Sequence, residues 1–150
     1  MHIKENTRDT VFTPDVLEAW PHIKEAVRRG EQLTQQVWSS REMLTASEAA
    51  GRLGTSRQTI NRLRQARKLL GVNIKGNRAY RYPSWQFDIT LTEGVRSALG
   101  ELCNYSDWGA YFFFIDKEPL LDARMPLDVI RAGDSEKVVK VAIILNESAE

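Results

Sequence analysis

The sequence predicts a mainly α-helical chain with one small β-hairpin. Apolar residues recur at helical spacing over most of the 150 residues, and capping and stop residues bound the segments. The period changes once, after Gly71, where two short alternating runs flank Gly76-Asn77, a dipeptide typical of a tight turn. A chain of this length forms one ordinary domain or two small ones.

Composition predicts a folded protein of the cytoplasm. The hydrophobic fraction is 42%, and no apolar run approaches the roughly 20 residues of a membrane span, so we expect no membrane partner. The start, MHIKENTRDT, has no apolar stretch typical of a secretory signal. Cys103 is the only cysteine, which fits a reducing compartment, and we expect its side chain to be half-buried.

Charge divides the chain into three parts. Residues 41–82 carry ten basic and two acidic residues, whereas residues 83–150 carry six basic and twelve acidic ones. Residues 1–40 are nearly neutral, with five basic and six acidic residues. A basic middle beside an acidic end indicates two surfaces with different partners.

Residues 1–40 are predicted to form a helical arm. Thr13-Pro14 is typical of a helix start, Pro21 of a kink or restart, and Gly30 of a stop before a second helical stretch over 32–38. The arm either packs on the rest of the chain or forms a dimer contact. Its apolar face comprises Val16, Leu17, Trp20, Ile23 and Val27.

Residues 41–83 are predicted to hold two short helices joined by a turn. Thr45 to Glu48 has the pattern of a capping box, and the helix after it is expected to bury Ala49, Ala50 and Leu53. Gly54 supplies a left-handed turn, and Ser56 begins a second helix that runs to about Leu70. Two helices around a short glycine-containing turn form a helix-turn-helix.

A basic hairpin follows the second helix. Val72 and Ile74 on one side, and the run from Ala79 to Tyr82 on the other, are predicted to be two strands closed by Pro83. In this position the hairpin is typical of a wing. The fold class predicted for residues 41–150 is therefore a winged helix-turn-helix followed by a small helical domain over 84–150.

The second helix of a helix-turn-helix presents polar side chains to the DNA major groove. Arginine pairs with guanine, and asparagine or glutamine pairs with adenine. A solvated basic helix remains the alternative. Arg64, Arg67 and Lys68 are assigned to phosphate contacts or plain surface. The predicted DNA-binding residues are Thr45, Ser56, Arg57, Gln58, Thr59, Asn61, Arg62, Lys75, Asn77, Arg78 and Arg81.

Residues 44–83 resemble the winged helix-turn-helix of excisionases and MerR-like regulators. The resemblance lies in the order of threonine, Glu-Ala-Ala, leucine, serine and Thr-Ile-x-Arg, followed by a short basic wing. It implies that the helix from Ser56 reads the major groove. It also implies that the wing contacts the minor groove or phosphates through Lys75, Asn77, Arg78 and Arg81.

Residues 84–150 are predicted to be helical. A helix begins near Leu91, the apolar run 108–115 is expected to be buried or to contact a partner, and Pro126 begins a short helix that Gly133 stops. Asp134-Ser135 caps a last helix over 136–146. The acids of this half either face a basic partner or form a solvated face.

Trp108 is followed by the pattern Pro-x-Leu-x-x-x-x-Pro-Leu-Asp-x-Ile-x-x-Gly over residues 119–133, and then by a last helix rich in valine and alanine. In these features residues 99–142 resemble the toxin-binding domain of the Xre/MbcA/ParS antitoxins. That family commonly has Gly-Gly-Arg-Thr before Pro-Leu, where this chain has Asp-Ala-Arg-Met at 122–125, and its DNA-binding part is commonly a helical bundle without a wing. The resemblance implies a toxin partner. The candidate toxin-binding residues are Trp108, Phe112, Pro119, Leu121, Arg124, Pro126, Leu127 and Asp128.

Together these patterns predict an antitoxin of a type II toxin-antitoxin system. We expect a homodimer that represses its own operator DNA and neutralises its cognate toxin through the C-terminal domain. The alternative is an excisionase-like or MerR-like regulator without a toxin partner. No enzyme, metal or cofactor is predicted, because the two histidines lie near the N-terminus and no phosphate loop, metal-ligand cluster or activated nucleophile is visible.

Overall fold

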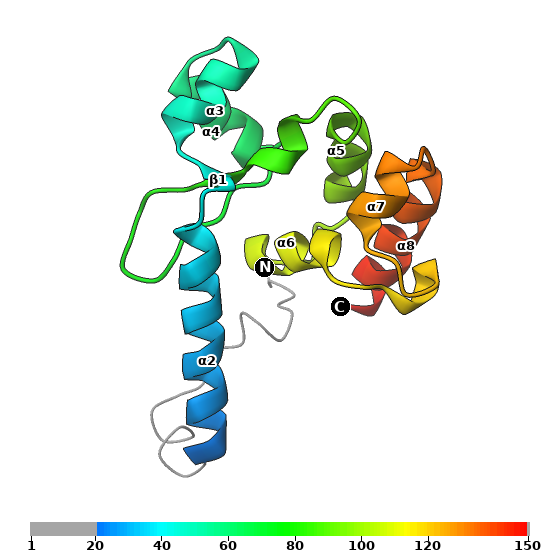
Figure 1. The fold of residues 1–150 in the computed structure, drawn as a ribbon, viewed down its shortest axis with the longest axis horizontal. Coiled ribbons are helices and arrows are strands. Elements are labelled where there is room, and N and C mark those ends of the chain that lie inside the picture. Colours follow the sequence, from blue (N-terminus) through cyan, green and yellow to red (C-terminus); the bar gives the residue numbers. More distant parts are fainter. Residues whose placement is uncertain (1–20, 150) are drawn as a thin grey trace.

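The computed structural model describes residues 21–149 as seven α-helices, two 3-10 turns and one small antiparallel sheet. The predicted helix start at Thr13-Pro14 lies outside the described residues. Figure 1 shows α2 as a separate rod, with α3 and α4 above its C-terminal end and the last four helices gathered on the other side. Within residues 21–149, no helix combines the length and apolarity needed to cross a membrane.

The helix α2 runs without a break from Pro21 to Trp38. The sequence predicts a helix stop at Gly30, and that prediction is wrong. Gly30 lies in the helix interior without a left-handed backbone, and no described residue outside its own stretch of helix backbone comes within 4 Å of where its Cβ would stand. Among the described residues, the C-terminal end of α2 packs most firmly, through the buried Trp38 and the half-buried Val37.

The helix pair α3 (Ala46–Leu53) and α4 (Arg57–Gln65) confirms the two predicted helices and their turn. Gly54 has φ of 63°, a left-handed conformation that glycine adopts without strain. Ala49 and Ala50 are buried as expected, but Leu53 is 41% exposed. The second helix ends at Gln65, before Leu70, because Arg67 takes a left-handed backbone with φ of 59°.

The predicted hairpin forms only in part. A single bridge joins Val72 and Arg81, and the regular sheet lies elsewhere, between β1 (Met43–Leu44) and β2 (Tyr82–Pro83). The second predicted strand therefore pairs mainly with the segment in front of α3. Pro83 is tolerated at this position because both strands of a two-stranded sheet are edge strands. A wing with two regular strands is not seen in the described residues.

The C-terminal half contains η1 (Ser84–Phe87), α5 (Thr92–Gly100), α6 (Asp107–Ile115), η2 (Pro119–Leu121), α7 (Pro126–Arg131) and α8 (Ser135–Ser148). The apolar run 108–115 is buried as α6, and Pro126 begins α7 as predicted. Asp134 precedes α8 but makes no side-chain cap, since its carboxylate pairs with Lys137.

Two clusters of apolar side chains hold the fold together. The smaller one lies under α3 and α4, and the larger one lies among α5 to α8. The larger cluster also takes side chains from the first half of the chain, so the predicted parts 41–83 and 84–150 share a core. These contributions come from Trp38, Met43, Leu70 and Val72.

Candidate nucleic-acid interface

The helix α4 is fixed by its buried side and leaves its polar side in solvent. Ile60 is fully buried, while Arg57, Gln58, Asn61 and Arg62 are exposed. At its start the hydroxyl of Ser56 accepts a hydrogen bond of 3.1 Å from the backbone N–H of Thr59. This is the cap predicted for Ser56, and it sets where the helix begins.

The start of α3 holds the predicted capping box. Thr45 Oγ1 accepts from the Glu48 N–H at 3.1 Å, and the Glu48 carboxylate accepts from the Thr45 N–H at 2.8 Å. That backbone hydrogen bond lowers the pKa of Glu48. The hydroxyl of Thr45 therefore has a structural role in addition to its place on the exposed surface.

The loop from Gly71 to Arg81, which we call the wing segment, turns at Gly76 with φ of 82°. Two backbone hydrogen bonds of 2.9 and 2.8 Å between Val72 and Arg81 close it. Asn77 Oδ1 accepts from the Ala79 N–H at 2.9 Å, which stiffens the tip. Lys75 and Arg78 project from this tip as exposed cations.

A groove of about 670 Å³ lies between the start of α3, the exposed side of α4 and the wing segment. It collects predicted DNA-binding residues from all three segments. Ser56, Thr59 and Arg62 lie on α4 or its cap outside its lining, and Lys75 and Asn77 line a different groove beside α2. The predicted residues that line the first groove are Thr45, Arg57, Gln58, Asn61, Arg78 and Arg81.

Arg81 contacts Trp38 at the end of α2. Its guanidinium lies 3.7 Å above the ring of Trp38 and donates a 3.0 Å hydrogen bond to the Trp38 carbonyl. The guanidinium of Arg81 thus joins the wing segment to the end of α2 by a cation–π contact. Of the predicted wing cations, Lys75 and Arg78 remain in solvent, with Lys75 only 3.9 Å from Glu31.

Arg64 and Arg67 are not plain surface side chains, which corrects that part of the expectation. Arg64 is half-buried, with its guanidinium 3.7 Å above the Tyr80 ring and donating to Asn61 Oδ1. Gly71 is required beside it, because a Cβ there would approach Arg64 Cδ and Tyr82 Cε2 to 2.8 Å. The periodicity of α4 shows which side is polar but not that two arginines fold back onto the chain.

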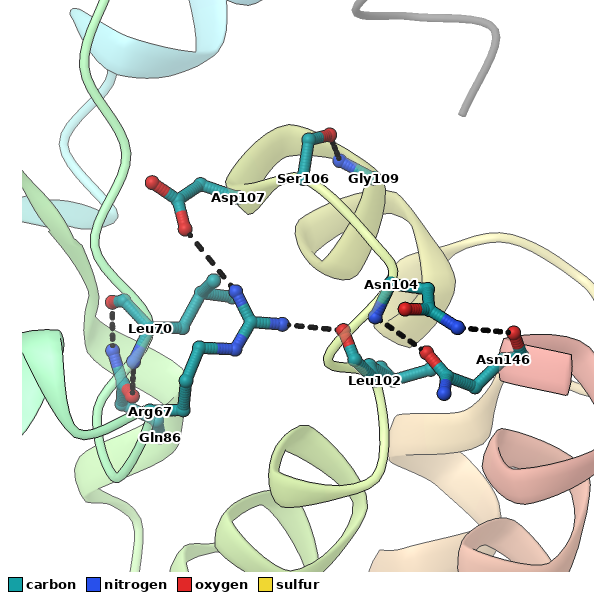
Figure 2. Close-up of polar contacts among 9 residues, drawn as sticks. All are labelled: Arg67, Leu70, Gln86, Leu102, Asn104, Ser106, Asp107, Gly109 and Asn146. Atoms are coloured by element: carbon teal, nitrogen blue, oxygen red, sulfur yellow. Dashed lines mark hydrogen bonds and ion pairs between the residues drawn. The ribbon is translucent and has the colours of Figure 1, made fainter. Parts of the chain in front are cut away.

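Arg67 lies at the junction between the two halves of the molecule (Figure 2). Its Nη2 donates to the Leu102 carbonyl at 2.7 Å, and its Nη1 lies 3.4 Å from Asp107 Oδ1. Burial raises the pKa of Asp107, and the charge of Arg67 opposes that rise. This contact ties the end of α4 to the start of α6.

Two amides complete the junction. Gln86 is buried, and its side chain exchanges hydrogen bonds of 2.9 and 2.8 Å with the backbone of Leu70. Asn104 donates bonds of 2.7 and 3.1 Å to Asn146 on α8, from its backbone N–H and its side-chain amide (Figure 2). Sequence reasoning missed these side chains, since their partners lie 16 and 42 positions away.

The predicted toxin-binding residues differ in burial. Trp108 is half-buried and donates from Nε1 to the Asn73 carbonyl at 2.8 Å. Those inside the large core or packed into the fold are Phe112, Leu121, Pro126 and Leu127. Those in solvent are Pro119, Arg124 and Asp128. Pro119, Arg124 and Asp128 are therefore open to a partner protein, Trp108 and Phe112 line the groove beside α2, and Leu121, Pro126 and Leu127 are buried.

The loop from Glu118 to Arg124, which we call the 118–124 loop, has an unusual backbone. A bridge between Glu118 and Arg124 closes it, and both Asp122 and Ala123 have positive φ, 57° and 60°. Left-handed backbone costs a residue with a Cβ about 1–2 kcal/mol. The loop presents Leu120, which is 55% exposed.

The described residues hold no group of three histidine, cysteine, aspartate or glutamate side chains able to bind a metal. Cys103 is exposed, not half-buried as expected, and its sulfur lies 3.5 Å from Asn146 Nδ2. Comparison with known proteins gives no further assignment: no family model, curated protein or solved structure matches the chain.

Proposed function

We propose that the chain is a transcriptional regulator that binds duplex DNA through α4 and the wing segment. One observation carries this proposal: the groove of about 670 Å³ gathers Arg57, Gln58 and Asn61 from α4 with Arg78 from the wing segment. A recognition helix contacts base edges mainly with residues of its first turns, where these three lie. Their side chains are those that pair with guanine and adenine.

The charge of the segment supports the same function. Residues 41–82 carry ten basic residues against two acidic ones. Arg57, Arg62, Lys75 and Arg78 are the exposed cations around the groove and at the wing tip. Each phosphate neutralised by such a cation releases counterions, so the affinity for DNA should fall steeply with salt.

The test is selection of bound sequences from a random duplex DNA pool, followed by a mobility-shift titration with the selected duplex. Arg57→Ala and Asn61→Ala should weaken binding about 5- to 150-fold and relax the base preference at one position each. Arg78→Ala should weaken binding to all duplexes and reduce the salt slope by about one. Arg96→Ala, an exposed arginine on α5, is the matched control. Unchanged affinity in the Arg57 and Asn61 variants would overturn the proposal.

We further propose that the C-terminal half binds a protein partner, as in a type II antitoxin. The 118–124 loop favours this function, because it keeps two strained residues and holds a leucine side chain in solvent. Strain of this kind is maintained at functional sites. The plain DNA-binding regulator is the alternative, in which this loop has no partner.

Co-expression with the product of the adjacent gene tests the partner. The full chain should relieve any growth defect that this product causes and should retain it in a pull-down. Leu120→Asp should abolish both effects, whereas Ile89→Asp, at a side chain 92% exposed elsewhere, should not. If the full chain neither retains the product nor restores growth, the antitoxin function fails and the plain regulator stands.

A further inference from the structure

The helix α2 carries an apolar face that the described part of the chain leaves uncovered. At 3.6 residues per turn, this face occupies an arc of about 120°. It lines a groove of about 1090 Å³ whose opposite wall is formed by residues 73–78 together with Trp108 and Phe112. The groove-lining residues of this face are Ile23, Ala26, Val27, Gly30, Leu33 and Thr34.

The apolar face of α2 is self-complementary, because its residues lie in pairs at equal distances on either side of Gly30. Ala26 and Thr34 lie four positions on either side of Gly30, and Val27 and Leu33 lie three positions on either side. A two-fold interface needs this property, since each residue that meets a second residue is met by it in return. We infer that the groove accommodates α2 of a second copy of this chain, antiparallel to the first and crossing it at Gly30.

Gly30 fits the crossing point. Within the described residues, a Cβ at this position would meet nothing within 4 Å, so that part of the subunit does not require glycine there. In the antiparallel pair, Val27 packs on the partner subunit's Leu33, and the two glycines face each other on the axis. Without side chains at that point the two backbones can approach closely.

The charges beside the face agree with this pairing. The Lys75 ammonium lies 3.9 Å from Glu31 at the edge of the groove. A two-fold axis at Gly30 brings the partner's Glu31 to the same edge of the helix pair, and the partner's Lys75 with it. Two carboxylates and two ammonium groups then alternate there, which compensates the approach of the two acids.

The size of the contact reaches the threshold for a biological interface. An 18-residue helix is about 27 Å long and about 10 Å wide. Seated in a groove, it covers two walls, which over two copies amounts to about 1,000 Å², the smallest area expected of a biological interface. This dimer does not depend on the proposed DNA binding, although Lys75 and Arg78 of the wing tip also line the groove beside α2. If both hold, the dimer fixes the separation of two α4 helices for a two-fold DNA site.

Sedimentation equilibrium of the full chain without DNA tests the inference, so its failure is separate from failure of DNA binding. The expected mass is twice 17.1 kDa. Gly30→Glu should raise the dimer dissociation constant about 100-fold or more, because it sets two like charges on the axis. Gly100→Glu is the matched control, since Gly100 is also an exposed helical glycine with nothing within 4 Å of its Cβ position.

A crosslink tests the geometry. In a Cys103→Ser background, Gly30→Cys should form a disulfide-linked dimer rapidly, whereas Gln32→Cys, on the opposite side of α2, should not. A monomeric full chain overturns the inference, as does equal crosslinking at both positions. A chain that dimerises only after deletion of residues 1–20 also overturns it, because those residues would then be the occupant of the groove.

Discussion

The two apolar clusters differ in how many side chains of the helices around them stay exposed to solvent. The smaller one, under α3 and α4, consists of Ala49, Ala50, Ile60, Leu69 and Tyr82, and the polar side of α4 above it stays in solvent. The larger one surrounds the aromatic residues of α6, of which Tyr111 to Phe114 are all buried. The first half thus leaves the polar side chains of α4 exposed to solvent, whereas the second half contributes most of the buried apolar side chains.

The sharpest way to test this difference is to truncate one fully buried side chain in each cluster. Phe114 packs 5.6 Å from Trp85 and 5.1 Å from Phe113, measured between ring centroids. Phe114→Ala should lower the free energy of unfolding by about 3–5 kcal/mol. Ile60→Ala should lower it by about 2–5 kcal/mol. Urea denaturation measures both.

Hydrogen exchange separates the two variants. Phe114→Ala should speed amide exchange across the chain, since the large cluster includes side chains from both halves. Ile60→Ala should speed it mainly in α3 and α4. Ile89→Ala, at a surface position, is the control and should change stability by less than about 0.5 kcal/mol. Equal effects of both core variants on every helix would mean that the two clusters unfold as one.

Two arginines show the same difference between an exposed surface and a packed interior. Arg62 is exposed on α4, whereas Arg67 bonds to the Leu102 carbonyl and faces Asp107. Arg67→Met should lower the free energy of unfolding by about 1.5–3 kcal/mol, because it removes a charged hydrogen bond and the cation that pairs with Asp107. Arg62→Met should change it by less than about 0.5 kcal/mol. If the two variants unfold at the same urea concentration, the junction does not depend on Arg67.

The local elements of this fold could be predicted from sequence because their causes are local. The capping box at Thr45 and the cap at Ser56 each join residues three positions apart. Tyr82 pairs with Leu44, and Arg67 bonds to Leu102, across 38 and 35 positions. The periodicity of a sequence does not show which residues pair across such distances. The partial wing and the buried arginines could therefore not be predicted. The DNA-binding and toxin-binding assignments stay predictions.

The 118–124 loop offers a change that should stabilise the second half. Ala123→Gly relieves a left-handed alanine, and we expect a gain of about 1 kcal/mol in the free energy of unfolding. Ala132→Gly is the matched control, because Ala132 has φ of −76° at the end of α7 and glycine should only add chain entropy there. A loss of stability in both variants would show that the loop is not strained at Ala123.

The smallest expected effect is a pH dependence at the junction between the halves. Burial raises the pKa of Asp107 above its ordinary value of 3.8, so the folded chain holds this proton more tightly than the unfolded chain. The stability that this proton contributes is present below the unfolded pKa and is lost as pH rises through the folded pKa. Asp107→Asn should remove that dependence, measured by urea unfolding from about pH 3 to pH 7. Parallel stability curves for the two proteins over this range would mean that solvent screens Asp107, whose side chain is 39% exposed.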